Sequence, residues 1–378
     1  MLYATHAQVD LSAIRHNLDG VRSAVGDRTV LVAVKADAYG HGAVAVSQMV
    51  QATGCADWLG VATVPEALEL REAGITLPIL KLSHCFPGEE MEAAIAADVV
   101  TAVPSRECAD ALQEAAARVG RPARVHLKVD TGMARIGVAV AEAAEVAAHV
   151  EALPDVRLEG IFTHLPVSDT ASQDEFTEDQ VARFREVVDA VHARLGRALE
   201  HVHCANSGGV LGHSSSWLTM VRPGIMAYGY YPDVTTPRSI PLRQAVRWVS
   251  RVSFVKRVPA GTTVGYGRTW HSEQDRWIGT MPVGYADGYD RHLSNRGRVL
   301  VDGRSCPIAG RVCMDQTMID LGPADRPCPV QVGDEVVLLG ASGESAITTD
   351  EMADLLGTIT YEVTCHIGKR VGRTYIDA

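Results

Sequence analysis

The chain has 378 residues, of which 47% are hydrophobic and 21% charged, with a formal net charge of −11. This length predicts two domains, and neither a membrane-spanning apolar run nor a secretory signal is visible. The acidic balance without a lysine and arginine cluster argues against nucleic acid, and eight scattered cysteines without zinc spacing favour a cytoplasmic enzyme with reduced thiols and no metal site.

In chain order, the first part alternates short apolar runs with helical patterns. Strands are expected at 29–34, 58–62, 77–82, 99–103, 125–129, 158–163, 201–205 and 218–221, and helices at 9–25, 43–52, 63–73, just after 88, 105–119, 140–152 and 175–195. Such alternation implies parallel strands joined by helical crossovers. Eight repeats over roughly 230 residues favour a closed (β/α)₈ TIM barrel over an open sheet.

After about Pro232 the pattern changes to short β-rich runs broken by glycine, proline and aspartate. The runs lie at 249–258, 277–283, 298–301, 312–321 and 334–339, with one short helix at 347–356 capped by Thr348 or Thr349. We therefore expect a barrel domain at 1–235 and a mostly-β domain at 236–378. A strand before Asp10 could pair with either domain.

Lys35 directly follows the first buried strand, where a cation is costly unless it is paired, covalently used or placed at a mouth. Taken alone, it is better interpreted as a lysine that reaches solvent. Barrel enzymes, however, keep their chemistry at the C-terminal ends of the strands. Other polar residues fall at that end, which favours a functional Lys35: Lys128, Asp130, Arg135, His164, Asn206, Ser207 and Arg222.

Small residues follow the last two strands, at 206–209 and 223–225. They leave backbone N–H groups free to approach an anion, as in barrel phosphate sites, although ordinary glycine-rich turns are an equally good interpretation. A reactive lysine facing a phosphate cradle indicates pyridoxal phosphate, which lysine holds as a Schiff base. In the second domain, Tyr266 and Tyr285 have glycines close by, which permits close backbone approach, but either alone is usually a packing residue.

Nine motifs along the chain resemble those of the alanine racemase family and occur in the family's order. Members of this family are fold type III pyridoxal-phosphate enzymes. The motifs are Val-Lys-Ala-Asp-Ala-Tyr-Gly-His-Gly at 34–42, Leu-Lys-Val-Asp-Thr-Gly-Met-Ala-Arg-Ile-Gly at 127–137, Thr-His at 163–164, Ala-Asn-Ser at 205–207, Val-Arg-Pro-Gly-Ile at 221–225, Gly-Tyr-Gly at 265–267, Gly-Tyr-Ala-Asp-Gly at 284–288, Cys-Met-Asp at 313–315 and Tyr-Glu-Val-Thr-Cys at 361–365. The resemblance covers nearly the whole chain.

The resemblance implies a two-base racemisation of L-alanine and D-alanine that supplies D-alanine for peptidoglycan. Lys35 would bind the cofactor and act as one base, and Tyr266 from the other subunit of a homodimer would be the second. Arg222 would contact the pyridine nitrogen, where a permanent cation disfavours protonation, and His164 would lie between Tyr266 and Arg222. Such cations would also stabilise the phenolate of a tyrosine base.

The resemblance implies further contacts with the cofactor and the amino-acid substrate. The phosphate would be held by Tyr39, Ser207, Gly224, Ile225 and Tyr361, with Asn206 beside it. The substrate carboxylate would be held by Arg135 with the backbone of Met314. Supporting roles would fall to Lys128, often carbamylated in this family, and to Tyr285 and Asp315.

The resemblance also implies an entry to the site. This entry would be lined by Asp169, Arg291, Arg311 and Ile359, with Tyr285 and Tyr361 as an inner gate.

Three departures from the family pattern leave substrate preference and entry geometry open. Asp37 stands where the family usually has asparagine, and the stretches 165–168 and 365–373 differ from the usual motifs. A serine or broad-specificity racemase of the same fold is therefore an alternative. A decarboxylase of basic amino acids is disfavoured by Arg135 and Tyr266, and a non-catalytic cofactor carrier by the second domain.

Overall fold

The computed structural model describes residues 2–376, which contacts group into two compact units. The barrel unit comprises Ala13–Ala38 and Gly42–Gln244. The C-terminal unit comprises the residues up to Ser12, the short stretch Tyr39–His41, and the chain from Ala245 onward.

Eight parallel strands form the barrel unit, in the order β10-β2-β3-β4-β5-β6-β8-β9. The ring closes between its two end strands, since the Thr219 amide donates to the Val202 carbonyl at 3.1 Å and the Arg222 amide to that of Ala205 at 2.9 Å. The predicted (β/α)₈ barrel is thereby confirmed. The strands are β2 (Thr29–Ala33), β3 (Trp58–Val61), β4 (Ile79–Lys81), β5 (Val99–Val103), β6 (Ala123–Asp130), β8 (Val156–Phe162), β9 (His201–His203) and β10 (Met220–Val221), with the short β7 (Val138–Ala139) beside β6.

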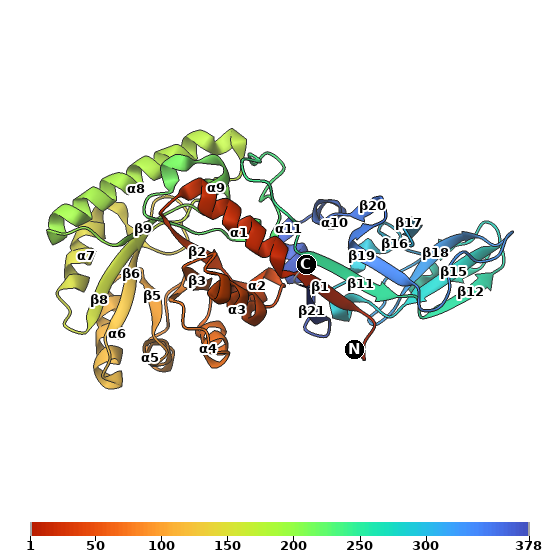
Figure 1. Ribbon diagram of the computed structural model, residues 1–378, viewed down its shortest axis with the longest axis horizontal. Coiled ribbons are helices and arrows are strands. Elements are labelled where there is room, and N and C mark those ends of the chain that lie inside the picture. Colours follow the sequence, from red (N-terminus) through yellow and green to blue (C-terminus); the bar gives the residue numbers. More distant parts are fainter. Residues whose placement is uncertain (1, 377–378) are drawn as a thin grey trace. The chain divides into compact units, whose positions relative to one another are not determined.

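Helices lie outside this ring of strands (Figure 1). They are α1 (Leu11–Val25), α3 (Ala43–Thr53), α4 (Val64–Glu72), α5 (Glu89–Ala96), α6 (Arg106–Val119), α7 (Ala143–Glu151), α8 (Asp174–Leu195) and α9 (Ser207–Gly212). Local sequence sets where they begin: the Thr63 side chain accepts the Glu66 amide at the start of α4, and Ser105 accepts that of Cys108 at the start of α6.

Side chains from several strands fill the barrel interior, and they are not all apolar. One buried cluster joins Leu31, Trp58, Leu80, Val100 and Met220. Elsewhere the register aligns two rows across β6, β8 and β9 that each contain two polar side chains: His126 with Gly160 and His201, and Lys128 with Phe162 and His203. Because branched apolar residues usually fill such barrels, these rows mark a specialised side of the core.

The C-terminal unit is mostly β, as expected. Its larger sheet has the order β17-β16-β19-β11-β1-β21 with β20 beside β19, and a smaller one has the order β12-β15-β18. The strands are β1 (His6–Asp10), β11 (Val246–Arg251), β12 (Phe254–Val258), β13 (Thr263–Val264), β14 (Trp270–His271), β15 (Arg276–Met281), β16 (Arg298–Val301), β17 (Arg304–Pro307), β18 (Thr317–Pro323), β19 (Glu335–Ser342), β20 (Ser345–Ile347) and β21 (Gly372–Ile376), with helices α10 (Thr349–Leu356) and α11 (Thr360–Cys365).

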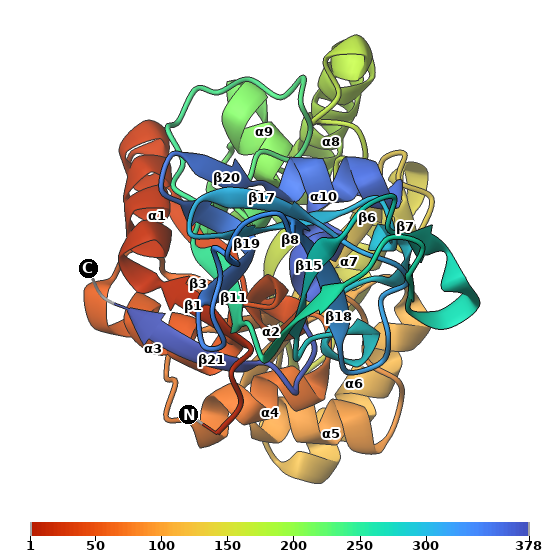
Figure 2. The same ribbon diagram turned by 90° about the vertical axis from the view of Figure 1, so that its right-hand side faces the viewer.

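Three details of this unit refine the predictions. The N-terminal strand β1 pairs antiparallel with β11 and parallel with β21, beside which it lies in Figure 2, so it joins the C-terminal unit. The predicted strand 249–258 is two strands in different sheets, because the Val252 amide bonds to Asp334 and the Ser253 amide to Thr280. Thr348, rather than Thr349, caps α10.

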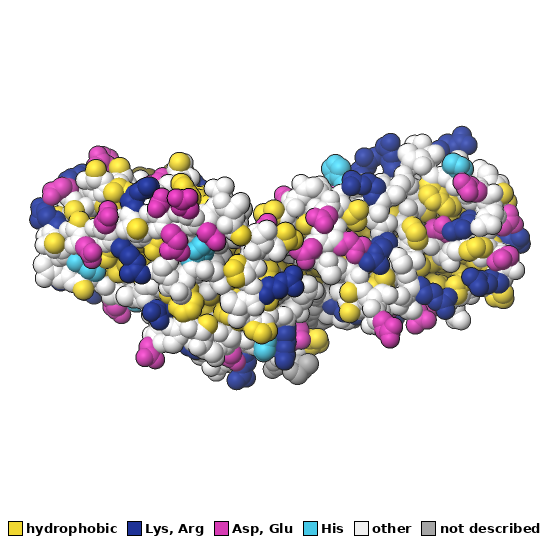
Figure 3. Space-filling model, turned by 90° about the horizontal axis from the view of Figure 1, so that it is seen from above, with side chains coloured by type: hydrophobic (Ala, Val, Ile, Leu, Met, Phe, Trp, Pro, Cys, Tyr) yellow, Lys and Arg dark blue, Asp and Glu magenta, His cyan; other side chains and the backbone are white. Residues whose placement is uncertain are grey.

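Within residues 2–376, no helix is both long and apolar enough to cross a bilayer, and no group of three or more His, Cys, Asp or Glu side chains is arranged to hold a metal. On the face shown in Figure 3, acidic and basic side chains are interspersed over both units.

Candidate active site

Lys35 begins an unusual left-handed turn, α2 (Lys35–Tyr39), directly after β2. Ala36, Asp37, Ala38 and Tyr39 have φ angles of 53°, 54°, 52° and 54°. Left-handed conformations cost non-glycine residues about 1–2 kcal/mol each, so surrounding contacts must hold the turn. This strained turn sits at the C-terminal mouth of the barrel and carries the predicted cofactor lysine.

Two carboxylates hold the backbone of this turn. Glu66 accepts the Ala36 amide at 2.7 Å, and Asp37 accepts the Ala43 amide, at the start of α3, at 2.8 Å. The departure at Asp37 therefore has a local role, because an anion at a helix N-terminus is favourable.

Arg222 lies buried at the end of β10, surrounded by neutral acceptors. Its Nη1–H donates to Nδ1 of His203 at 2.9 Å, and Nη2 donates to the carbonyls of Thr163 at 2.9 Å and Cys204 at 3.1 Å. Burial lowers the pKa of Arg222 to about 10, which leaves it charged at neutral pH. Its Nε–H has no acceptor within residues 2–376 and is available to a ligand.

His164 lies beside Arg222, and Nη2 of Arg222 is 3.4 Å from Nδ1 of His164. Burial lowers the pKa of His164 well below its usual value, and the charge of Arg222 adds to this. His164 is therefore a neutral imidazole, and the positive charge of the expected pair resides on Arg222 alone.

Lys128 in β6 is a second buried cation of the barrel interior. Its Nζ lies 4.6 Å from the centroid of the Phe162 ring and makes no hydrogen bond or ion pair with any residue in 2–376. Burial lowers the pKa of Lys128 well below its usual value, with further contributions from Arg222 and Arg135. A buried lysine without an anionic partner favours the neutral amine, which is nucleophilic.

Arg135 is exposed on the loop that joins β6 to β7. Asp130 shapes this loop by accepting the amides of Gly132 at 2.9 Å and Ala134 at 3.1 Å. Gly137 permits the return, since an added Cβ would lie 2.6 Å from the Asp130 nitrogen. The guanidinium is thus presented at the same mouth of the barrel as Lys35.

The small-residue loops after β9 and β10 are tied together by Ser207, whose Oγ accepts the Gly224 amide at 2.9 Å and the Met226 amide at 3.4 Å. Asn206 begins α9 by accepting the Gly209 amide at 3.0 Å. It also binds the stretch that departs from the family pattern, since Ser168 Oγ donates to its Oδ1 at 2.6 Å. Ile225 follows Gly224 in the same loop and is fully buried.

The predicted site residues of the barrel unit carry a surplus of positive charge. Arg222, Arg135 and Lys35 all disfavour the protonation of His164, as does Lys128 whenever it is charged. Such a group of cations suits a ligand that bears phosphate and carboxylate groups. The donor set therefore fits pyridoxal phosphate together with an amino acid.

The remaining predicted residues belong to the C-terminal unit. Tyr266 is 72% exposed and lies between Gly265 and Gly267, whose φ angles are 76° and 72°. Tyr39, although close to Lys35 in sequence, groups with this unit, and its ring lies 6.1 Å from that of Tyr361. Burial raises the pKa of Tyr39, so its phenol stays neutral and can donate a hydrogen bond.

Met314 and Asp315 lie on a loop that packs against the glycine before Tyr285. The amide of Ala286 donates to the Met314 carbonyl at 3.1 Å, and a Cβ on Gly284 would lie 2.4 Å from that oxygen. Asp315 accepts a hydrogen bond from Arg370 at 2.8 Å, and Met314 itself is 52% exposed.

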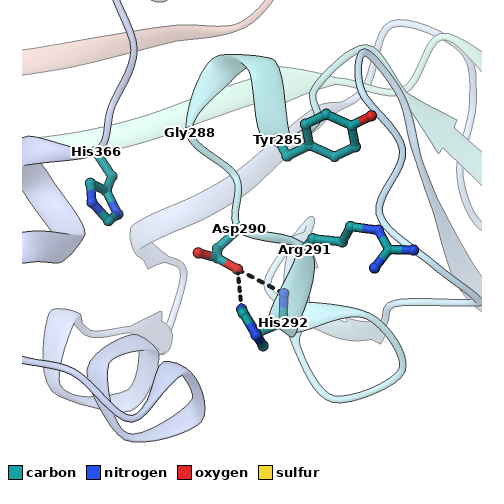
Figure 4. Close-up of a pocket in the computed structure, with 6 residues that line it drawn as sticks. All are labelled: Tyr285, Gly288, Asp290, Arg291, His292 and His366. Carbon is teal, nitrogen blue, oxygen red and sulfur yellow. Dashed lines mark hydrogen bonds and ion pairs between the residues drawn. The ribbon is translucent and has the colours of Figure 1, made fainter.

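Two of the predicted entry residues share a pocket of about 460 Å³ in the C-terminal unit (Figure 4). Tyr285 and Arg291 line it with Asp290, His292 and His366, and Asp290 Oδ1 is 2.8 Å from Nδ1 of His292. Arg311 lies elsewhere, against Gly267, and Ile359 is 58% exposed just before α11. Asp169 belongs to the barrel unit, where burial raises its pKa.

Two residues of the site were not predicted from the sequence. Glu66 carried a signal, because it completes the capping box that begins at Thr63. His203 carried a weaker one, since it is a polar residue inside a buried strand. Neither pattern alone reveals contact with the turn after Lys35 or with Arg222.

Comparison with known proteins assigns both parts of the chain. Residues 9–232 match the family model for the alanine racemase N-terminal domain and residues 245–375 that for the C-terminal domain. The alanine racemase of Cutibacterium acnes is 50% identical over 372 residues, which are 98% of each chain. Among solved structures, the alanine racemase of Clostridium difficile 630 matches with a TM-score of 0.93 and 36% identity, covering 100% of this chain and 97% of that one. An alanine racemase from Bartonella henselae with covalently bound pyridoxal phosphate matches with a TM-score of 0.86 and 27% identity, covering 99% of each.

Proposed function

This chain belongs to the alanine racemase family, and we propose that it interconverts L-alanine and D-alanine with Lys35 and Tyr266 as its two bases. The observation that carries the proposal is the position of Lys35, on a strained turn at the barrel mouth where Arg222, Lys128 and Arg135 gather. This arrangement can bind an anionic cofactor and an amino-acid carboxylate together.

Pyridoxal phosphate, when bound, delocalises the negative charge that develops on the substrate Cα. Lys35 would hold the cofactor covalently, and Ser207, Gly224 and Ile225 would surround its phosphate, with Asn206 fixing the start of their loop. Tyr39 and Tyr361, whose ring centroids lie 6.1 Å apart, would add further contacts with the phosphate.

Each remaining side chain has a definable task in moving the Cα proton. Nζ of Lys35 would exchange this proton on one face of the substrate, and Oη of Tyr266 on the other. Arg135 would orient the carboxylate, with the backbone of Met314 beside it. The Nε–H of Arg222 would donate to the cofactor ring nitrogen, and because arginine stays charged, that nitrogen would remain unprotonated.

We propose a homodimer in which Tyr266 completes the site of the partner subunit. Supporting this, Tyr266 is 72% exposed, and Met314 and Tyr285 of the same unit also expose 52% and 42% of their surface. Exposed aromatic and methionine side chains are typical of surfaces that contact another chain. The neutral His164, which accepts from Arg222 at Nδ1, would offer its Nε2–H to the oxygen of this tyrosine.

The wider biological role is also a proposal. The enzyme would act in the cytoplasm and supply D-alanine for peptidoglycan, and its functional division would fall near residue 235, between the two family models.

A racemisation assay tests the function and separates alanine from the serine alternative. The purified chain with added pyridoxal phosphate is given L-alanine, L-serine and two larger L-amino acids, and the D-enantiomers are measured by chiral chromatography. Fastest conversion of alanine supports the proposal. Faster conversion of serine, or no conversion of alanine, contradicts it.

A further inference from the structure

A chain of hydrogen bonds runs from Arg222 into the barrel interior. Nη1 of Arg222 lies 2.9 Å from Nδ1 of His203, and Nε2 of His203 lies 2.9 Å from Nδ1 of His126. His126 and His203 are both fully buried, and their rings meet edge to face at 5.1 Å. All three side chains come from neighbouring parts of the barrel wall.

The chemistry of arginine fixes where the protons of this chain reside. A guanidinium only donates, so Nδ1 of His203 must accept and its proton must be on Nε2. His203 then donates to Nδ1 of His126, whose own proton is on Nε2. Burial lowers the pKa of both histidines well below the usual value, with Arg222 adding to the effect on His203, so both rings are neutral.

A histidine at position 126 is energetically unfavourable unless its hydrogen bond to His203 is needed. Its Nε2 is buried and has no hydrogen-bond partner within residues 2–376, which is unfavourable because a buried polar atom has lost its bonds to water. The Nε2 atom is tightly enclosed, since a Cβ on the neighbouring Gly160 would lie 2.9 Å from it. An apolar side chain would avoid this penalty, and such side chains normally fill barrel interiors.

We propose that His126 is a positioning residue for the racemase reaction: by accepting from Nε2–H of His203, it anchors that ring and stabilises the tautomer and orientation in which Nδ1 accepts from Arg222. This holds the guanidinium in place without a carboxylate that would neutralise it. The neutral side chains of His203 and His126 would therefore orient the guanidinium that faces the cofactor ring nitrogen. This inference deepens the proposed function, and the change in kcat expected for the His126 variants rests on that function.

The tautomer can be measured without cofactor or catalysis. In the intact chain freed of pyridoxal phosphate and labelled with ¹⁵N-histidine, nitrogen resonances distinguish protonated from unprotonated ring nitrogens. The expected spectrum has an unprotonated Nδ1 and a protonated Nε2 on His203. A protonated Nδ1 on His203 overturns the proposal, whatever the reaction of the enzyme.

Two variants of similar size separate hydrogen bonding from packing. His126→Asn places an amide oxygen near the position of Nδ1 and retains the acceptor, whereas His126→Leu removes it. We expect His126→Leu to mix the His203 tautomers and lower kcat by about tenfold with KM within about twofold, because a hydrogen bond to a charged network is lost. His126→Asn should restore both the single tautomer and most of kcat.

His201→Leu is the matched control, because His201 lies in the same row as His126, across Gly160, and its ring packs 5.4 Å from that of His126 without bonding to His203. It should leave the His203 tautomer unchanged. Equal losses in His126→Asn and His126→Leu, or no change in either, overturn the proposal. If His126→Leu does not fold, His126→Phe, which also lacks an acceptor at this position, takes its place in the same comparison. An inactive wild-type enzyme with the expected tautomer contradicts the proposed function alone.

Discussion

The carboxylate of Glu66 accepts the amide of Ala36 at 2.7 Å, immediately after Lys35, and with its other oxygen accepts the amides of Ala62 at 2.7 Å and Thr63 at 3.0 Å. One side chain therefore joins the start of α4, the end of β3 and the left-handed turn that follows Lys35. Because that turn is intrinsically unfavourable, its geometry depends on this contact.

We expect Glu66→Ala to lower the free energy of unfolding by about 2 kcal/mol, since it removes the capping box and leaves three amides without their acceptor. It should also weaken cofactor binding, because Lys35 is less firmly held. Urea unfolding and titration with pyridoxal phosphate measure the two effects. Glu69→Ala, an exposed change on the same helix, is the control and should stay within about 0.5 kcal/mol of wild type. Similar losses in both variants would show that Glu66 has no special role.

Lys35→Ala should abolish the visible absorbance of bound pyridoxal phosphate, because the covalent attachment requires this amine. Absorption spectroscopy of the desalted protein measures the effect. Lys256→Ala removes an exposed lysine of β12 and should keep the full absorbance. Persistence of the absorbance in Lys35→Ala would falsify the assignment.

The strand pattern of the barrel was predictable because its interior strands are short, apolar and bounded by helix starts such as Thr63 and Ser105. The turn after Lys35 was not, because its four left-handed residues include no glycine and are held by distant groups, chiefly Glu66. The same limit applies to β1, whose pairing with β21 joins the two ends of the chain and leaves no local signal.

Among the site residues, motif resemblance supplied the proposed roles, and the structure supplied their electrostatics. The neutral state of His164 depends on burial beside Arg222, which sequence spacing does not reveal. The bond from Arg222 to His203 likewise depends on two strands that are adjacent only in the closed barrel.

Lys128 should react with carbon dioxide, since its lowered pKa leaves a neutral amine among cations that would stabilise an anionic product. The amine nitrogen forms a bond to the carbon and releases one proton, which gives a carbamate. With ¹³C-bicarbonate, NMR should show a carbamate carbon in the wild-type protein and none in Lys128→Met. Lys256→Ala should retain the signal, and its presence in Lys128→Met would place the modification elsewhere.

Stability should fall as the solution is acidified below about pH 6.5. The pKa values of His126, His164 and His203 are all well below normal in the folded protein, so the unfolded chain takes up their protons first. Each such histidine should remove up to about 1.4 kcal/mol per pH unit, and the loss continues down to its folded pKa.

Urea unfolding of the holoenzyme between about pH 7.5 and about pH 5.5 measures this slope. His164→Asn removes one of the three buried histidines and should make the free energy of unfolding less dependent on pH. His271→Asn, at an exposed histidine, should leave this pH dependence unchanged. A slope that both variants share with wild type would assign the acid sensitivity to other groups.

Mixing two inactive variants should restore activity if Tyr266 serves the site of a partner subunit. Lys35→Ala lacks the cofactor amine and Tyr266→Phe lacks the second base, so a hybrid dimer would contain one site with both intact. Since only about half of the dimers are hybrids, and each has one complete site of two, the expected recovery is roughly a quarter of wild-type activity. Mixing Lys35→Ala with Lys35→Arg is the control and should recover none. No recovery from the first mixture, once mass spectrometry shows that subunits have exchanged, would mean that Lys35 and Tyr266 act within one chain or that Tyr266 is not a base.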